Sequence, residues 1–279
     1  MNGWIYHHHL DPVLLHLGPL RIGWYGLMYA AAFLILYAVK SREGRRPGAL
    51  VPAEDMPNLL TYIILGVIVG GRLGWVLFYG GSQYFFEPWR ILETWKGGMS
   101  FHGGMLGVLA SLLIYGRMRG ISAVDLADWG VIWSTVGLGL GRIGNFINAE
   151  LYGKPTGGTW GVVFPSDPQH LPRHPSQLYE AAYEGLFLFL ALAALKRWLP
   201  WRGMQPAAFL FLYGVGRIAV EFVRLPDQQL GYILFGFGTM GQLLSLPMLV
   251  IGLAWILWIA GRELQCGKAR PSTSGVNVE

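Results

Sequence analysis

The stretch VIWSTVGLGLGRIGNFINAELYG, residues 131–153, places polar and charged side chains directly after an apolar run. With its flank, the apolar part is long enough to lie in a bilayer, where one helical span needs about 20 predominantly apolar residues. A central arginine disfavours insertion of a membrane helix by about 2.5–3.5 kcal/mol, so Arg142, with Asn145 and Glu150 after it, indicates function. The stretch therefore predicts a membrane-embedded helix that leads into a functional site.

The composition of the whole chain is that of a membrane protein. Hydrophobic residues make up 53% of its 279 residues and charged ones only 13%, whereas soluble domains average about 25% charged residues. The 40 glycines, set between apolar runs, are typical of closely packed membrane helices. We therefore expect an all-α polytopic membrane protein with seven transmembrane helices. The apolar runs that predict them are Ile22–Val39, Leu59–Tyr79, Gly103–Gly116, Val124–Leu140, Leu178–Leu195, Ala207–Phe222 and Met240–Ala260.

Basic residues are concentrated in the loops that follow the first, third, fifth and seventh apolar runs. Short loops rich in Lys and Arg face the cytoplasm, so we expect the N-terminus outside and the C-terminus in the cytoplasm. The net charge of +5 is then a topology signal and requires no nucleic-acid partner. The residues that carry this signal are Lys40, Arg42, Arg45, Arg46, Arg117, Arg119, Lys196, Arg197, Arg202, Arg262, Lys268 and Arg270.

The chain shows no repeat and no second soluble domain. We expect one transmembrane catalytic domain over residues 1–265 and a disordered cytoplasmic tail over residues 266–279, where Ser, Gly and Pro are frequent. The domain is expected to include a small head segment on the outer side, at about residues 141–177. The longest stretch between spans, Glu150–Pro175, has no obvious elements, and ordered loops of that length are usually functional.

The sequence argues for no metal and no cofactor. Cys266 is the one cysteine, which excludes an intramolecular disulfide and argues against a thiolate metal site. The histidine run at residues 7–9 is interpreted as a polar run before an interfacial segment rather than as a metal cluster.

Three arginines, Arg72, Arg142 and Arg217, lie within or at the edges of apolar runs. Arg217 can form an i,i+4 ion pair with Glu221, and Arg72 can pair with a carboxylate or with backbone carbonyls. Even so, the sequence shows no matching surplus of intramembrane acids. We therefore expect an anionic ligand from outside, most simply a lipid phosphate, because guanidinium groups bind phosphate in a bidentate manner.

His102 is predicted at the outer start of the third span, before two glycines. A helix N-terminus disfavours imidazolium and keeps the ring neutral, as a general base must be. A structural, hydrogen-bonded histidine is the alternative. Tyr25 is expected to face outward, either in the site or in the aromatic belt, and Ser176 reads as the N-cap of the fifth span.

Taken together, these motifs resemble the bacterial prolipoprotein diacylglyceryl transferases over nearly the whole chain. The most specific element is residues 141–153, and the other motifs follow in the family's order. They are Asp11-Pro12-Val13, Trp24-Tyr25-Gly26-Leu27-Met28-Tyr29, Gly71-Arg72-Leu73-Gly74, Phe101-His102-Gly103-Gly104, the run from His174 to Glu180, and Tyr213–Arg217.

The resemblance implies seven transmembrane helices in the bacterial inner membrane and an active site open to the outer leaflet. It implies transfer of the diacylglyceryl group from phosphatidylglycerol to the lipobox cysteine of a prolipoprotein signal peptide, with release of glycerol phosphate, as the first step of lipoprotein maturation. By the family's pattern, Arg142 and Arg217 handle the phosphate. The candidate catalytic residues are thus His102, Arg142 and Arg217, and the candidate substrate-binding residues are Tyr25, Arg72, Asn145, Glu150, Gly153, Tyr213 and Glu221.

Two other functions fit part of the sequence. A transporter for organic anions would also place arginines in a helical bundle, but transporters commonly show two corresponding halves, and none is visible here. Acyl transfer from a phospholipid would break a different bond and give a thioester or amide and a lysolipid.

Overall fold

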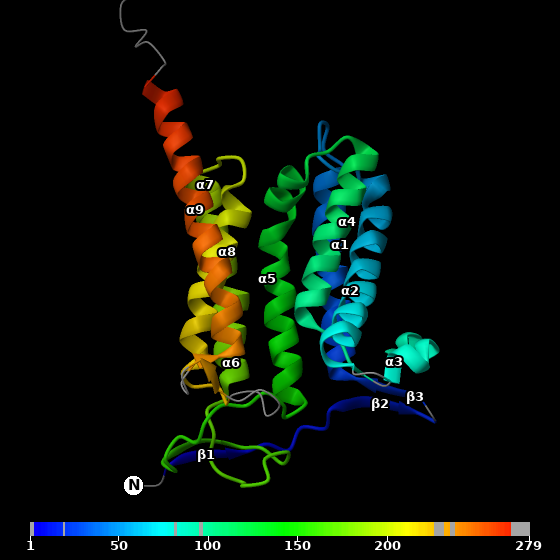
Figure 1. Cartoon of the computed structure of the whole chain (residues 1–279), viewed down its shortest axis with the longest axis vertical. Coiled ribbons are helices and arrows are strands. Elements are labelled where there is room, and N and C mark those ends of the chain that lie inside the picture. Colours follow the sequence, from blue (N-terminus) through cyan, green and yellow to red (C-terminus); the bar gives the residue numbers. More distant parts are fainter. Residues whose placement is uncertain are drawn as a thin grey trace, which may run out of the picture. The chain divides into compact units, whose positions relative to one another are not determined.

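The computed structural model describes residues 3–18, 20–80, 83–94, 97–225, 232–234 and 238–268. In these residues, a long helix lies at each of the seven predicted apolar runs, which confirms the all-α polytopic class; residues 22–23 belong to a β-strand instead, and Phe222 lies one residue past its helix. The long helices are α1 (Trp24–Gly44), α2 (Met56–Tyr79), α4 (Phe101–Arg119), α5 (Ala123–Ile147), the continuous segment α6 (Ser176–Glu180), η4 (Ala181–Phe187) and α7 (Leu188–Trp198), then α8 (Met204–Glu221) and α9 (Met240–Lys268) (Figure 1).

Within the described part of the chain, four helical segments are long and apolar enough to cross a membrane by these two criteria alone: Trp24–Gly44, Ala53–Phe78, Ser176–Trp198 and Gly241–Gln265. The last helix, α9, continues to Lys268, past the tail boundary predicted at residue 265. Its basic residues fit the final turns because cations are favoured at a helix C-terminus. The remainder of the predicted tail, residues 269–279, lies outside the described residues.

Short β-strands were not expected from the sequence. The described residues contain β1 (Trp4–His7), β2 (Val13–Leu17), β3 (Leu20–Gly23), β4 (Trp160–Val163), β5 (Tyr232–Leu234) and β6 (Gly238–Thr239). β1 pairs with β4 in parallel, while β2–β3 and β5–β6 are antiparallel pairs. The described residues also contain the short helical turns η1 (Ala53–Asp55), α3 (Gln83–Phe86) and η2 (Pro88–Leu92).

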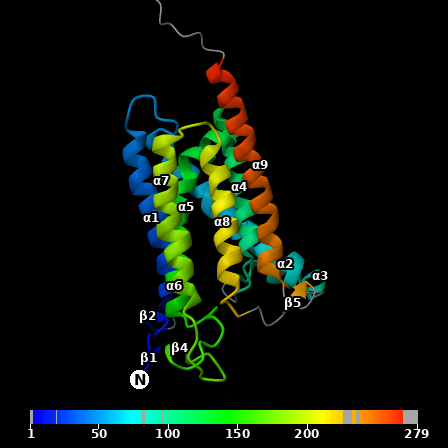
Figure 2. The same cartoon turned by 90° about the vertical axis from the view of Figure 1, so that its left-hand side faces the viewer.

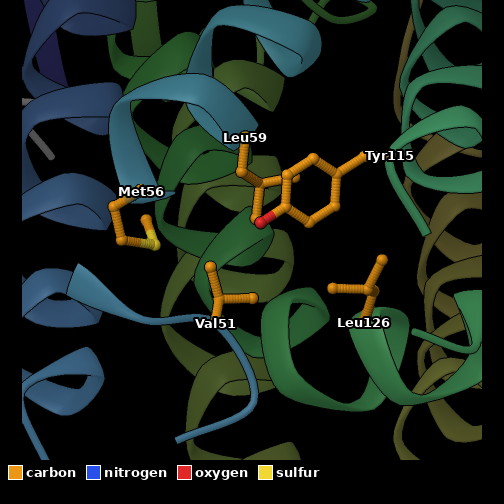
Figure 3. Close-up of a cluster of buried hydrophobic side chains, with 5 residues drawn as sticks. All are labelled: Val51, Met56, Leu59, Tyr115 and Leu126. Atoms are coloured by element: carbon orange, nitrogen blue, oxygen red, sulfur yellow. The ribbon is translucent and has the colours of Figure 1, made fainter. Parts of the chain in front are cut away.

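The chain divides into two compact units, residues 33–129 and residues 1–32 with 130–279. In the first unit α2 packs along α4 through facing glycines: a Cβ on Gly70 would lie 2.4 Å from the carbonyl oxygen of Gly103, and one on Gly107 would lie 1.9 Å from that of Gly66. Small residues let membrane helices approach this closely. At the N-terminal end of α2 a buried cluster consists of Val51, Met56, Leu59, Tyr115 and Leu126 (Figure 3).

In the second unit α9 runs along α8, as Figures 1 and 2 show. Gly252 meets α8 at the backbone, since a Cβ there would lie 2.5 Å from the nitrogen of Phe211. Buried Leu192, Ala208 and Met204 then fill the space between α7, α8 and α9. Beyond the helix ends, β1 and β4 form a small head whose apolar core is Ala149, Tyr152, Val162 and Phe164.

Candidate functional site

Arg142, in the penultimate turn of α5, is held by two carboxylates from the next membrane segment. Its Nε and Nη2 lie 2.8 and 3.2 Å from the two oxygens of Glu184, a bidentate contact. Its Nη1 lies 3.0 Å from Oε2 of Glu180. Both glutamates are buried, with side chains 0% (Glu180) and 2% (Glu184) exposed, while Arg142 keeps 14% exposure. The guanidinium group is therefore fixed but still reachable.

Arg217 in α8 shares one of these carboxylates. Its Nη1 lies 2.5 Å from Glu180 Oε1 and 3.3 Å from Glu221 Oε2. The latter contact is the i,i+4 pair that the sequence predicted. Nη1 of Arg224, just beyond α8, lies 3.9 Å from oxygens of both glutamates. Thr239 donates its hydroxyl hydrogen to Glu221 at 3.0 Å, so β6 also contributes to the site.

These contacts define an arginine–glutamate cluster of three cations and three anions, formed by Arg142, Arg217, Arg224, Glu180, Glu184 and Glu221. The prediction that the arginines lack matching acids is therefore wrong. Two of the acids, Glu180 and Glu184, come from a segment distant in sequence from Arg142. Burying an unpaired charge this deeply would cost several kcal/mol of folding free energy. The three acids are therefore needed to keep the arginines inside the helical bundle.

Glycines bring the three segments of the cluster together. Gly139, one turn before Arg142, faces Gly185, and a Cβ on either would lie 2.8 Å from the Cα of the other. On α8, a Cβ on Gly216 would lie 1.8 Å from the ring of Tyr183, whose hydroxyl donates to the carbonyl of Leu212 at 2.8 Å. Any side chain at these glycines would separate α5 and α8 from the η4 segment.

A second polar group follows α5. Asn145 donates its amide hydrogen to Glu150 Oε1 at 2.7 Å, and Asn148 lies 3.4 Å from the same oxygen. The ring of Tyr25 covers Gly144, where a Cβ would lie 2.9 Å from Tyr25 Cδ2. Asn145 is within hydrogen-bonding reach of the Tyr25 hydroxyl. Three predicted site residues, Tyr25, Asn145 and Glu150, are thus together.

The backbone around Glu150 is strained. Ala149 and Leu151 on either side have φ of 56° and 59°, a region that non-glycine residues rarely adopt. Side chains of α6 hold it there: Gln177 donates to the carbonyl of Glu150 at 2.6 Å, and Ser176 donates to that of Leu151 at 2.9 Å. The prediction of Ser176 as N-cap is wrong, because α6 begins at Ser176 itself and its hydroxyl is used on the loop.

Gly153 lies where two other chain segments leave no room for a side chain. Its N–H donates to the carbonyl of His174 at 2.8 Å, and it bridges to Arg224. A Cβ at this position would lie 2.6 Å from the carbonyl oxygen of Val223 and 2.7 Å from His174 Cβ. Gly153 therefore serves the close approach of backbones beside Arg224.

Comparison with known proteins gives this arrangement a family. A family model described as prolipoprotein diacylglyceryl transferase matches residues 12–258. The chain belongs to the prolipoprotein diacylglyceryl transferase family. It is 49% identical over 248 residues to a phosphatidylglycerol–prolipoprotein diacylglyceryl transferase of Nitratidesulfovibrio vulgaris, covering 89% of this chain and 94% of the relative. Proteins of the same name from Pseudomonas putida (49% over 261 residues, 91% and 96%) and Pseudomonas entomophila (48% over 267 residues, 93% and 97%) are equally similar.

Membership in this diacylglyceryl transferase family leaves the role of each residue to the structure, and Arg72 shows why. Arg72 is 4% exposed, and it donates to the carbonyl oxygens of Ile91 (2.7 Å), Gly97 (2.7 Å), Gly98 (3.1 Å) and Arg90 (2.6 Å). These bonds use four of the five N–H donors of a guanidinium group. The structure therefore favours the backbone-carbonyl alternative for Arg72, in which it holds the backbone at residues 90–91 and 97–98, over substrate binding.

His102, in the same unit as Arg72, is the second residue of α4. Ser100 caps this helix, since its hydroxyl accepts a hydrogen bond from the N–H of Gly103 at 3.2 Å. The side chain of His102 is exposed. The predicted position at a helix N-terminus is confirmed, and the role as a base stays a prediction.

Tyr213 lies beside the arginine–glutamate cluster. It is 4% exposed, stacks on Phe209 with ring centroids 5.6 Å apart, and is close enough to interact electrostatically with Arg142 and Arg217. The sequence analysis missed Glu184 and Arg224. A signal was present for both, because Glu184 follows Glu180 by four residues and Arg224 follows Glu221 by three, spacings that share a helix face.

The head beside the site is stabilised by a buried ion pair between Asp167 and Arg173, with two hydrogen bonds of 2.7 and 2.8 Å. Burial alone would raise the pKa of Asp167. The bonds and charge of Arg173, with the N–H groups of Gln169 and Leu171, outweigh burial and hold this pKa below its ordinary value. The ring of Tyr152 covers the Arg173 guanidinium, 5.2 Å from its centroid. The stretch predicted to lack obvious elements is therefore ordered around β4.

The histidine run has a structural role. His7 ends β1, and His8 is 6% exposed between Phe146 and Phe164, with ring centroids 5.2 and 5.5 Å away. Burial lowers the pKa of His8 more than its backbone contact with Phe146 raises it. Among the described residues, no group of three or more His, Cys, Asp or Glu side chains is arranged to hold a metal ion.

Proposed function

We propose that this chain transfers the diacylglyceryl group of phosphatidylglycerol to the lipobox cysteine of a prolipoprotein. The cysteine sulfur attacks the carbon of the diacylglycerol part that is bonded to a phosphate oxygen, so a carbon–sulfur bond forms and the bond between that carbon and that oxygen breaks. The electron pair of the broken bond leaves with glycerol phosphate, and the product is a thioether. The observation that carries this proposal is the arginine–glutamate cluster, in a chain of this family.

The cluster supports the departure of the phosphate. Negative charge grows on the phosphate oxygens as the carbon–oxygen bond breaks, and fixed cations in a site of low polarity stabilise that growth. Arg142 and Arg217 are fixed because Glu180 contacts both, at 3.0 and 2.5 Å. The glutamates neutralise the free site, so the arginines can remain in the membrane until the lipid arrives. The arginines then stabilise the transition state, in which the phosphate gains negative charge, more than they stabilise the bound lipid.

His102 is proposed to take the proton of the thiol. A cysteine thiol has a pKa of about 8.5 and is mostly protonated at neutral pH, so a neutral imidazole would raise the fraction of thiolate. The dipole of α4 favours the neutral ring at this position. Tyr25, Asn145, Glu150 and Tyr213 are proposed to bind the substrates, with Glu221 supporting Arg217.

We further propose that residues 1–265 act as one catalytic domain in the bacterial inner membrane. The head at about residues 141–177 would face the periplasm and the site would open to the outer leaflet, where the lipobox peptide arrives. The asymmetry of Lys and Arg between alternate loops supports this orientation.

The direct test uses purified protein in detergent, phosphatidylglycerol and a synthetic lipobox peptide. The expected result is a peptide whose mass increases by one diacylglyceryl group, with release of glycerol phosphate. A thioester-linked acyl chain and a lysolipid would instead show acyl transfer. Counterflow of an organic anion in sealed vesicles, without peptide modification, would show a transporter and overturn the proposal.

A further inference from the structure

Arg142 has a particular orientation because Glu184 contacts it from the side. The carboxylate spans Nε and Nη2 at 2.8 and 3.2 Å, and Glu180 reaches Nη1 at 3.0 Å. Nη1 and Nη2 each carry two hydrogens, so one N–H on each is left over from these contacts. With 14% of the Arg142 side chain exposed, these two N–H groups can receive an anion.

The backbone at Glu184 is packed closely against α5. Glu184 lies in η4, a π-helical turn, and such turns occur frequently at functional sites. The next residue, Gly185, is in contact with Gly139, one turn before Arg142 on α5, where a Cβ would lie only 2.8 Å from the facing Cα. The acid and the arginine are therefore anchored within one turn of a backbone contact.

Stability alone does not account for Glu184. Replacing a buried ion pair by apolar residues of similar volume is often neutral or stabilising, so a bundle of this kind does not need the pair in order to fold. The two acids also differ in their contacts. Glu180 forms ion pairs with Arg142, Arg217 and Arg224, whereas the direct ion pair of Glu184 is with Arg142. Among the described residues, Glu184 therefore makes its direct ion pair with Arg142 and acts on Arg217 only through the longer-range electrostatic field.

We propose that Glu184 is a positioning residue that turns the two remaining N–H groups of Arg142 toward the departing phosphate. This rests on the proposed function, since the phosphate is that of phosphatidylglycerol. Glu184 itself does not touch the reacting atoms. Its removal leaves the charge of Arg142 in the site but allows the side chain to rotate, and bidentate binding of phosphate depends on that orientation.

The first test compares Glu184→Gln and Glu184→Asp in the transfer assay, with Glu263→Gln as a control for the same chemical change on α9. Glu184→Gln is expected to lower kcat about 10–100-fold, which corresponds to the loss of one charge-assisted hydrogen bond. The KM for the lipid should change less. Glu184→Asp keeps the charge and should recover part of kcat. A rise in KM with unchanged kcat in Glu184→Gln would contradict positioning.

The decisive test is the double variant Arg142→Ala with Glu184→Gln. If Glu184 acts through Arg142, its substitution has no further effect on kcat once Arg142 is absent. Equal fold losses from Glu184→Gln in both backgrounds would overturn the proposal.

A readout independent of activity is the exchange rate of the Arg142 Nε hydrogen by ¹⁵N NMR, assigned with Arg142→Lys. We expect slow exchange in wild type and fast exchange in Glu184→Gln; unchanged exchange would contradict the contact. Absence of transfer by the wild type would overturn the proposed function alone, because the exchange measurement still decides the orientation of Arg142.

Discussion

Arg142→Ala is expected to have two separable effects, one on rate and one on stability. Loss of a cation from the developing phosphate charge should raise the barrier by about 3–4 kcal/mol, by analogy with oxyanion-hole deletions, or about 10²–10³ in rate. The same change leaves Glu184, 2% exposed, without its bidentate partner. Removing one member of a buried ion pair costs about 3–5 kcal/mol.

The stability loss can be measured as a shift in Tm in detergent. A change of 1 kcal/mol moves Tm by about 2–4 °C in a chain of this size, so Arg142→Ala should unfold about 6–20 °C below wild type. Adding Glu184→Gln removes the unpaired charge and should restore much of the Tm while leaving the rate low. Wild-type Tm in the single variant, or recovery of the rate in the double variant, would refute the reasoning from the buried pair.

Four further results are expected. In a Cys266→Ser background, a cysteine at Thr159 should react with an impermeant thiol reagent in intact spheroplasts and one at Pro47 should not; the reverse pattern would invert the proposed orientation. His102→Gln should slow transfer by roughly 10²–10⁴ at neutral pH, with a defect that shrinks toward the thiol pKa of about 8.5; a defect constant with pH would assign His102 to lipid binding or to the fold. Gly153→Ala should lower Tm and activity together, because its Cβ would lie 2.6 Å from the oxygen of Val223. A wild-type Tm would show that the two backbone segments can move apart at this point. Burial lowers the pKa of His8 in the folded state, so the stability of the fold falls as pH drops below the unfolded pKa of 6.5. His8→Phe should remove up to about 1.4 kcal/mol of that loss per pH unit, so Tm should gain more at pH 5.5 than at pH 8. Equal gains in Tm at the two pH values would contradict burial as the cause.

The sequence predicted the long helices well because each apolar run is a local signal. The i,i+4 pair of Arg217 and Glu221 was likewise local, and the structure confirms it at 3.3 Å. The partnership of Arg142 and Glu184 was not predictable in this way, because the two residues are 42 positions apart and are brought together by helix packing that includes the contact of Gly139 with Gly185. Packing, rather than spacing, decided this pair.

The strands escaped prediction for a related reason. β1 and β4 have four residues each, too few for a clear alternation, and each is stabilised by a partner far along the chain. Arg72 illustrates an alternative that the sequence left open. Whether its donors meet a substrate or backbone carbonyls depends on where the fold brings residues 90–91 and 97–98, which are 18 to 26 positions away along the chain.

The parallel pairing of β1 with β4 has a consequence for how the protein is made. Trp4–His7 leaves the ribosome well before its partner Trp160–Val163, which is synthesised only after four of the long helices, α1, α2, α4 and α5. Until then the first strand has an open edge, and unpaired edges in incomplete chains invite aggregation and proteolysis. The head is completed later still, when Arg224 arrives to bridge Gly153. An N-terminal affinity tag would therefore be attached next to a strand that stays unpaired during most of synthesis. A C-terminal tag is the safer choice for producing this protein.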